Sequence, residues 1–504
     1  MDYHHYFSFD WFGNLKSTLK TGNIRDHDYK MNMQQQPIES VIVGLGTTGL
    51  SVARYLSNQK RNFAVVDSRE NPPGADELKR DYVNSSDVPY HFGDFNAPCL
   101  KTAKQLIVNP GIAISTKEIQ FAKQTGVEII GDIELFARHV GETKPVIAIT
   151  GSNGKTTVTS LLDLMARKSG VIVGTGGNIG KAALDLLSDE SVELFLLELS
   201  SYQLETTPSL QTLTAVILNV SEDHLDRYNN SLGEYAQAKA VIYNNCEHIV
   251  FNREDAYSSR FAHEATGSKE MISFGLDKPK KDQYGLRQKE GLDWLAKGDE
   301  LLMLASEIKL PGKHNIANSL AALALGEVAG LKTSAMLDAL REYQGMEHRT
   351  QWLAELKGVN WYNDSKGTNV GATLAALSGL PRKTVLIAGG QGKGADFSPL
   401  GNVIKEKARA VVLMGEDAKK IAGIIDSSIE TVFVNDMAEA VKQAYQLANG
   451  VEKDNILLSP ACASFDMFKN YAVRGEIFID EVTKLKQAVS QARDGGEHVY
   501  TDVL

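Results

Sequence analysis

The sequence predicts an α/β protein with three domains, each built around a mostly parallel sheet. Two observations support this. Short apolar segments typical of buried strands alternate with helical patterns along the chain, and this alternation begins afresh near residues 40, 146 and 359. Strands that alternate with helices imply parallel sheets. The length of 504 residues also fits about three domains.

The first unit begins with an apolar segment at 41–43, which reads as a buried strand, and continues with a helix over 49–57. A second strand ends at Asp67. The stretch 141–145, Gly-Glu-Thr-Lys-Pro, has the composition of a linker. We therefore expect a Rossmann-like first domain over residues 37–143.

The second unit opens with a strand over 146–150, a glycine-containing loop and a helix that begins near Lys155. The more polar segment 252–305 predicts peripheral strands and turns, and 315–330 has the apolar spacing of a helix. This is the order of a P-loop ATPase-type domain, for which we expect the bounds 144–346.

The third unit follows Gly345 and is expected to be a second Rossmann-like domain over 347–504. Its apolar segments each have the length and composition of a strand, and helical patterns such as 437–447 separate them. The predicted strands start at Val359, Thr384, Ala410, Glu430 and Asn455.

Composition narrows the classes of partner. The net charge of −10 argues against a broad attraction to nucleic acid or an anionic membrane. The three cysteines, Cys99, Cys246 and Cys462, lie far apart without a CxxC pair, which favours a reducing compartment, and we expect a cytoplasmic protein. No apolar run approaches the roughly 18 residues of a spanning helix, so membrane insertion is not expected. Residues 1–36, including His4 and His5, lack a signal-peptide pattern and are expected to form a disordered extension.

The strongest local signal is the segment Thr150-Gly-Ser-Asn-Gly-Lys-Thr-Thr between a strand and a helix. Backbone N–H groups in such a loop can surround phosphate oxygens, Lys155 can reach the terminal phosphates, and the Thr156 hydroxyl can ligate Mg²⁺. The glycine spacing departs from the standard nucleotide loop, and the alternative is a tight turn that ends a strand. The candidate ATP-binding residues are Gly151, Ser152, Asn153, Gly154, Lys155, Thr156 and Thr157.

Two further residues follow apolar strands, where open α/β sheets place ligand-contacting groups. Glu198 can be a Mg²⁺ ligand or can cap the next helix. His224 can be catalytic or structural. In the first unit, Gly44-Leu-Gly-Thr-Thr-Gly with Asp67 at the next strand end is a weak dinucleotide signal, which alone would indicate an oxidoreductase.

Several long motifs, taken together and in this order, resemble those of the Mur ligase superfamily, which also includes folylpoly-γ-glutamate synthetases. The resemblance covers nearly all of the chain from residue 40. The motifs are TGSNGKTT at 150–157, GGNIG at 176–180, LELSSYQLE at 197–205, NVSEDHLDRY at 219–228, LPGKHNIAN at 310–318, HR at 348–349 and NDSKGTN at 363–369.

The resemblance implies an ATP- and Mg²⁺-dependent ligase that forms an amide bond through an acyl phosphate. It is strongest to members that add D-glutamate to UDP-N-acetylmuramoyl-L-alanine, because of GDIELF at 131–136, GGQGKGADF at 389–397 and LSPACASFDMFKN at 458–470. It further implies a metal set and a modification, with Lys239 converted by CO₂ into a carbamate; the alternative for Lys239 is a solvated surface charge. The implied catalytic and metal residues are Lys155, Thr156, Glu198, His224 and Lys239.

The resemblance also assigns binding residues. Adenine, ribose and phosphate contacts fall on Asn318, Arg349, Asp364 and Lys366. The UDP-linked substrate falls on Thr47, Thr48, Ser68, Arg69, Asn178 and Gln203. D-Glutamate falls on Thr368, Lys393, Ser464 and Tyr471.

Some positions depart from the pattern of the family. Ser68 stands in place of threonine and keeps a hydroxyl, Asn109 replaces a serine, and Tyr471 replaces phenylalanine. The competing hypotheses are another Mur or folylpolyglutamate ligase and a nucleotide-binding regulatory protein without catalysis. The Asp-Asn-Pro-Arg signature of diaminopimelate addition is absent from the sequence. We expect a monomer with no nucleic-acid partner.

Overall fold

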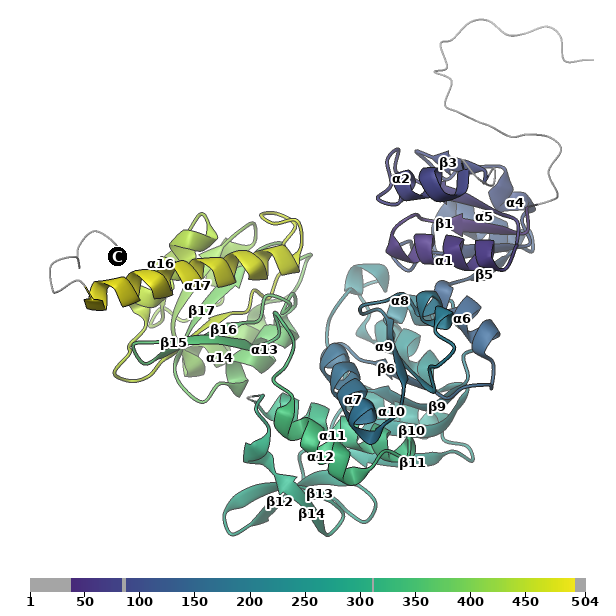
Figure 1. Cartoon of the computed structure of the whole chain (residues 1–504). Helices are drawn as coiled ribbons and strands as arrows, with labels where there is room; N and C mark the ends of the chain where they lie inside the picture. The colour runs from purple at the N-terminus through teal and green to yellow at the C-terminus, as the bar shows by residue number, and fades with distance from the viewer. Residues whose placement is uncertain (1–37, 84–87, 311, 495–504) are drawn as a thin grey trace, which may run out of the picture.

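The computed structural model describes residues 38–83, 88–310 and 312–494, and the predicted extension 1–36 lies outside them. Three sheets follow one another along the chain. Figure 1 shows the N-terminal sheet at one end of the central part and the C-terminal sheet beside it. The α/β fold class with mostly parallel sheets is confirmed.

The N-terminal sheet has five parallel strands in the order β3-β2-β1-β4-β5. The chain order reverses between β1 and β4, and ligands of such sheets bind at the carboxyl ends of the strands beside that point. Helix α1 (Thr47–Asn58) follows β1, and α6 (Asp132–Val140) leads to the next sheet. The strands are β1 (Ser40–Val43), β2 (Phe63–Asp67), β3 (Tyr90–Phe92), β4 (Gln105–Val108) and β5 (Glu128–Ile130).

The central sheet has nine strands in the order β14-β13-β12-β11-β10-β9-β6-β8-β7. The seven strands β12-β11-β10-β9-β6-β8-β7 are parallel, and β13 pairs antiparallel with both β12 and β14. Figure 1 shows β12, β13 and β14 at the outer end of this sheet. The strands are β6 (Val146–Thr150), β7 (Val173–Gly177), β8 (Leu194–Glu198), β9 (Thr212–Ile217), β10 (Cys246–Asn252), β11 (Glu270–Phe274), β12 (Tyr284–Lys289), β13 (Leu292–Lys297) and β14 (Glu300–Leu304).

Helices cover both faces of this sheet and form two separate apolar layers. Helices α7 (Lys155–Ser169), α11 (Lys313–Val328) and α12 (Thr333–Glu342) pack together in one layer, while α9 (Leu232–Ala240) belongs to the other. The polar segment 252–305 contains the expected peripheral strands and also helix α10 (Ala256–Ala265), which the sequence analysis did not predict. Asp255 caps α10 by accepting from the backbone N–H of Ser258.

The C-terminal sheet has the order β15-β16-β20-β17-β18-β19, and only the β15–β16 pair is antiparallel. Helices α13 (Val370–Gly379) and α14 (Ser398–Lys407) belong to one face, and α16 (Met437–Leu447) and α17 (Tyr471–Asp494) to the other. The strands are β15 (Gln351–Leu356), β16 (Val359–Asn363), β17 (Thr384–Gly389), β18 (Ala408–Met414), β19 (Glu430–Phe433) and β20 (Asn455–Leu458).

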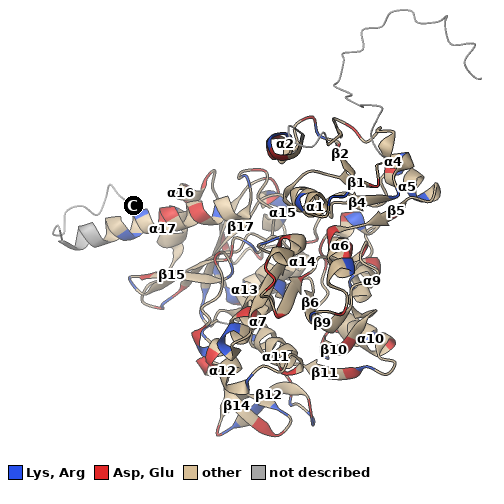
Figure 2. Cartoon of the chain, turned by 45° about the vertical axis from the view of Figure 1, so that its right-hand side comes forward, with Lys and Arg blue, Asp and Glu red and all other residues tan. Residues whose placement is uncertain are grey.

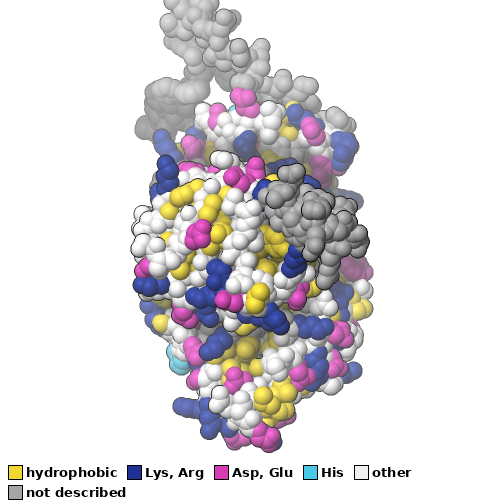
Figure 3. Space-filling model, turned by 90° about the vertical axis from the view of Figure 1, so that its left-hand side faces the viewer, with side chains coloured by type: hydrophobic (Ala, Val, Ile, Leu, Met, Phe, Trp, Pro, Cys, Tyr) yellow, Lys and Arg dark blue, Asp and Glu magenta, His cyan; other side chains and the backbone are white. Residues whose placement is uncertain are grey.

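The surface carries both signs of charge. Lys and Arg are interspersed with Asp and Glu along the chain in Figure 2, and the face drawn in Figure 3 has the same mixture with scattered apolar side chains. Among the described residues, no helix is long and apolar enough to cross a membrane.

Candidate active site

The phosphate loop joins β6 to α7. Gly154 is the N-cap of α7 and has a φ of +85°, a conformation that suits glycine. No side chain caps this helix, so its first N–H groups can bind an anion. Lys155 folds back over its own loop, where its Nζ donates to the backbone oxygens of Gly151 at 2.6 Å and Ser152 at 3.0 Å.

A segment that follows β9 fixes the shape of this loop. The side chain of Asn219 accepts from the N–H of Asn153 and donates to its carbonyl oxygen, both at 2.9 Å. The hydroxyl of Ser152 donates to the carbonyl of Ser221 and accepts from its N–H, also at 2.9 Å. Because these two hydrogen bonds occupy the Ser152 side chain, only the backbone of Ser152 can contact a phosphate.

Glu198 ends β8 and is 2% exposed. Its Oε1 accepts from Nδ2 of Asn178 at 3.0 Å, while Oε2 is buried and has no hydrogen-bond partner among the described residues. A buried carboxylate oxygen without a partner is costly. A hard cation would satisfy it, so Glu198 fits the metal role that its position predicts.

Lys239 lies on α9 and is 1% exposed, which excludes the alternative of a solvated surface charge. Its Nζ donates to the carbonyl of Gly151 at 3.2 Å and lies 4.4 Å from the ring centroid of Tyr235. Burial, together with the positive charge of Lys155, holds the pKa of Lys239 well below its ordinary value. A lowered pKa favours the neutral amine, the form that can react with CO₂.

His224 follows β9 with a φ of +54° and a side chain that is 45% exposed. Its Nε2 lies 3.6 Å from Oδ1 of Asp223. Within residues 38–83, 88–310 and 312–494, no group of three or more His, Cys, Asp and Glu side chains is gathered to hold a metal. The predicted metal set contains only two such residues, Glu198 and His224, and its other members are a hydroxyl and a modified lysine.

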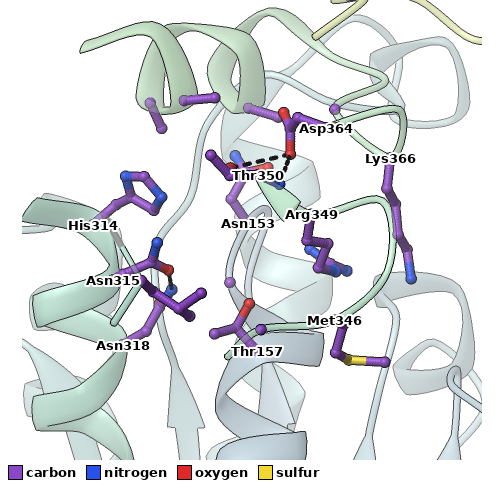
Figure 4. Close-up of a pocket in the computed structure, with 17 residues that line it drawn as sticks. Asn153, Thr157, His314, Asn315, Asn318, Met346, Arg349, Thr350, Asp364 and Lys366 are labelled. Atoms are coloured by element: carbon purple, nitrogen blue, oxygen red, sulfur yellow. Dashed lines mark hydrogen bonds between the residues drawn. The ribbon is translucent and has the colours of Figure 1, made fainter. Parts of the chain in front are cut away.

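A pocket lies beside the phosphate loop, between α11 and α13 (Figure 4). Its walls come from the loop, from α11, from the segment 345–350 and from the segment 364–376. Seven residues with a predicted role in ATP binding line this one pocket, although they span more than 200 positions of the sequence. They are Asn153, Gly154, Thr157, Asn318, Arg349, Asp364 and Lys366.

Two cationic side chains, Arg349 and Lys366, and one carboxylate, Asp364, line this pocket. Burial, with the neighbouring charges of Arg349 and Lys155, lowers the pKa of Lys366 to about 8. Burial raises the pKa of Asp364 to about 6, although its carboxylate accepts from Ser459 and from the N–H of Thr350. Partly desolvated cations around a phosphate loop attract a polyanion such as a triphosphate.

Arg349 crosses from the C-terminal part of the chain to the phosphate loop. Its guanidinium donates to the hydroxyl of Thr156, and its Nε is buried without a partner among the described residues. The two residues were predicted to contact different ends of ATP, and here they are hydrogen-bonded to each other. Arg349 must move away before the Thr156 hydroxyl can ligate a metal, because a cation now occupies that side of the oxygen.

The residues predicted to contact the UDP group lie at the carboxyl edge of the N-terminal sheet. Thr47 and Thr48 start α1, and Ser68 and Arg69 follow β2. Asp67 holds the Arg69 guanidinium by hydrogen bonds of 2.8 and 2.6 Å. Thr47, Ser68 and Arg69 are exposed and available to a ligand.

Gln203 differs from the other predicted substrate residues. It is 4% exposed, and its Oε1 accepts from the N–H of Ser200 in the capping box of α8 (Ser201–Leu204). Its side chain therefore has a structural role in capping α8, and its contact with substrate stays a prediction.

The residues predicted for D-glutamate lie on loops that follow β16, β17 and β20. Thr368 and Lys393 are exposed, whereas Ser464 is buried. Nζ of Lys366 lies 5.2 Å from the ring centroid of Tyr471, so a residue predicted for D-glutamate lies beside a residue that lines the pocket. The carboxyl ends of three strands thus present hydroxyls and a cation beside the nucleotide pocket.

Comparison with known families decides what this arrangement is. Three family models match the chain in order: "Mur ligase MurD-like, N-terminal domain" over 38–131, "Mur ligase middle domain" over 149–326 and "Mur ligase, glutamate ligase domain" over 348–462. Together they cover more than half of the 504 residues. The chain belongs to the Mur ligase family.

Curated Mur ligases resemble the chain over most of its length. A UDP-N-acetylmuramoylalanine–D-glutamate ligase of Nitrosococcus oceani is 49% identical over 448 residues, which is 88% of this chain and 96% of the relative. Proteins of the same name from Pseudomonas putida and Acinetobacter baylyi are 48% and 46% identical, each over 87% of this chain and 96% of the relative.

Solved structures of Mur ligases share the fold. A UDP-N-acetylmuramate-alanine ligase of Thermotoga maritima has a TM-score of 0.56 at 20% identity, covering 89% of this chain and 100% of that chain. A pseudomurein peptide ligase of Methanothermus fervidus has the same TM-score at 18% identity and the same coverage.

Some residues of the site were not singled out from the sequence of this Mur ligase. Asn219 clamps the phosphate loop, His314 and Asn315 line the pocket, and Asp223 lies beside His224. All four lie within the motifs NVSEDHLDRY at 219–228 and LPGKHNIAN at 310–318. The motifs were therefore sufficient to locate the site in the sequence. They did not indicate which of their residues contact one another.

Proposed function

We propose that this chain is the ATP-dependent ligase that joins D-glutamate to UDP-N-acetylmuramoyl-L-alanine in peptidoglycan precursor synthesis. The observation that carries the proposal is the pocket in which seven predicted ATP-binding residues meet beside the phosphate loop. Identity near 49% to D-glutamate ligases over 88% of the chain supports the choice of substrates.

The reaction we propose has two steps. The carboxylate of the acceptor attacks the γ-phosphorus of ATP, which forms an acyl phosphate and releases ADP. The amine of D-glutamate then attacks the acyl carbon, and collapse of the tetrahedral intermediate expels inorganic phosphate with one oxygen of the original carboxylate. Catalysis of this kind depends chiefly on positioning and on charge neutralisation.

The phosphate loop, Lys155 and Lys366 are placed to neutralise the triphosphate. Lys155 must swing out of the hydrogen bonds that now hold it to its own loop. We assign Mg²⁺ to Thr156, Glu198, His224 and Lys239, because the partnerless Oε2 of Glu198 suits a cation. The bound metal would neutralise charge on the transferring phosphoryl group.

We assign a carbamate to Lys239. An unmodified ammonium would repel Mg²⁺, whereas a carbamate offers two oxygens and a negative charge suited to it. The lowered pKa of Lys239 and its burial support the modification, since carbamylation needs the neutral amine.

The remaining assignments follow the three sheets. We place domain boundaries near 143/144 and 346/347, so that the first domain binds the UDP group through Thr47, Thr48, Ser68 and Arg69, and the third binds D-glutamate. Asn178, which contacts Glu198, and Gln203 are assigned to the acceptor. We propose a cytoplasmic location, because its nucleotide-linked substrate and ATP are cytoplasmic compounds, and a monomer stays a prediction.

An amino-acid panel tests the proposal. ADP release is measured with ATP, Mg²⁺, UDP-N-acetylmuramoyl-L-alanine and one amino acid at a time. We expect turnover with D-glutamate and at most slow turnover with L-glutamate, L-lysine or diaminopimelate. Equal rates with L-lysine or diaminopimelate would rule out the assignment to D-glutamate.

A further inference from the structure

Asn369 joins the C-terminal sheet to the central sheet at the edge of the site. Its Nδ2 donates to Oδ2 of Asp223 at 3.1 Å, across 146 positions of sequence. Its Oδ1 accepts from the N–H of Ala372 at 2.8 Å, which makes Asn369 the N-cap of α13. We propose that Asn369 is a positioning residue that docks α13 on the phosphate-loop side and so assembles the ATP pocket.

The first turn of α13 rests directly on the phosphate loop. A Cβ on Gly371 would lie 3.1 Å from Oγ of Ser221 and 3.3 Å from Nδ2 of Asn153, so the backbone of Gly371 lies close against these two side chains. Asn153 also donates to the Ser221 hydroxyl at 3.3 Å. The side-chain amide of Asn369 therefore adds a hydrogen bond where α13 and the phosphate loop are already closely packed.

Docking of α13 sets the width of the pocket. Ala372, Ala375 and Ala376 on α13 line the pocket opposite the phosphate loop and α11. The other bridge to this loop, from Arg349 to Thr156, uses two residues assigned to ATP and its metal. Neither Asn369 nor Asp223 is assigned to ATP or its metal, so the hydrogen bond between them can persist when ATP binds.

The partner of Asn369 is central to the charge balance of the site. Asp223 lies 3.6 Å from His224, and its negative charge favours the protonated forms of Lys155 and Lys239. A neutral amide orients this carboxylate without cancelling its charge, which a lysine or arginine in its place would do. The inference rests on the proposed function because it concerns the same site.

Two substitutions separate docking from helix capping. Serine and aspartate are both good N-caps, so Asn369→Ser and Asn369→Asp keep α13 capped. Serine is too short to reach Asp223, and aspartate sets two carboxylates against each other. We expect unchanged thermal stability for both, a decrease of about threefold in kcat/KM for Asn369→Ser and a decrease of about tenfold or more for Asn369→Asp.

The matched control is Asp436→Asn, an exchange between aspartate and asparagine at the N-cap of α16, which packs on the same sheet. It should retain wild-type kcat/KM. A second measurement does not use activity: the radius of gyration, from small-angle X-ray scattering of the protein without ligands. Asn369→Asp should increase it, and the double variant Asp223→Asn/Asn369→Asp, which restores an amide–carboxylate pair, should return it to the wild-type value.

The outcomes are distinct. If Asn369→Asp matches Asn369→Ser in both kcat/KM and radius of gyration, or if the double variant stays expanded, the proposal is wrong and Asn369 only caps a helix. A wild-type protein without ligase activity would contradict the proposed function instead, while the scattering result would still decide whether Asn369 docks α13.

Discussion

At the scale of single residues, the site contains lysines whose pKa is lowered by burial. Lys239 and Lys366 both have a lowered pKa, and burial is the largest cause in each case. The consequences differ, because a neutral Lys239 can be carbamylated whereas a neutral Lys366 cannot neutralise phosphate. Each residue therefore has its own test.

For Lys366, the pKa of about 8 predicts a pH effect on ATP binding. Below this pH the side chain is a cation that attracts the triphosphate, and above it the attraction is lost. The value of kcat/KM for ATP, which reports the free enzyme, should therefore fall as pH rises through about 8. Lys366→Arg keeps its charge and should lack this fall; an identical profile in the variant would assign the fall to another group.

For Lys239, we expect Lys239→Ala to be nearly inactive and to regain part of its activity in acetate, which can supply the missing oxygen ligands. Lys239→Arg should not respond, since its cation still fills the space. The measurement is the rate of ADP release at increasing acetate concentration. Near-normal activity of Lys239→Ala in CO₂-depleted buffer would show that no carbamate is needed.

At the scale of elements, close approach of backbones explains the glycines of the first βα turn. A Cβ on Gly49, in α1, would lie 2.2 Å from the carbonyl oxygen of Gly44, so any side chain must push α1 away from β1. This is why Gly44-Leu-Gly-Thr-Thr-Gly looks like a dinucleotide signature: the same geometry brings a helix N-terminus to a ligand whatever the ligand is.

We therefore expect Gly49→Ala to lower the free energy of unfolding by about 1–3 kcal/mol, the usual cost of overpacking, and to weaken binding of the UDP-linked substrate. Thermal denaturation and the KM for that substrate check both effects. Gly233→Ala on α9 is the control, because its Cβ would meet only Oγ of Ser231 at 3.6 Å and alanine favours a helix. A Gly49→Ala variant as stable as this control would contradict the account.

Much of the fold could be predicted at this scale, because buried parallel strands are continuous apolar runs. Those that begin at Ser40, Phe63, Val146 and Thr384 matched expectation. Helix α10 was missed because its segment is polar and buries only a narrow face around Phe261. The helical spacing of apolar residues is a weak signal in such a segment, because few of its residues are apolar.

At the scale of the whole molecule, the site is an assembly of distant segments. Sequence motifs could place Arg349 and Thr156 in one site, but they could not predict the hydrogen bond between them, because that contact depends on how two sheets pack. The same holds for Asn369 and Asp223. The mechanism we propose requires the C-terminal sheet to stay docked while Arg349 and Lys155 rearrange around ATP.

The acyl phosphate can be tested by following oxygen through the reaction. UDP-N-acetylmuramoyl-L-alanine labelled with ¹⁸O in its carboxylate is incubated with ATP, Mg²⁺ and D-glutamate, and the inorganic phosphate is examined by mass spectrometry. An acyl phosphate transfers one carboxylate oxygen to phosphorus, so the account predicts one ¹⁸O in each phosphate released and none in ADP. Unlabelled phosphate, or label in AMP, would contradict it.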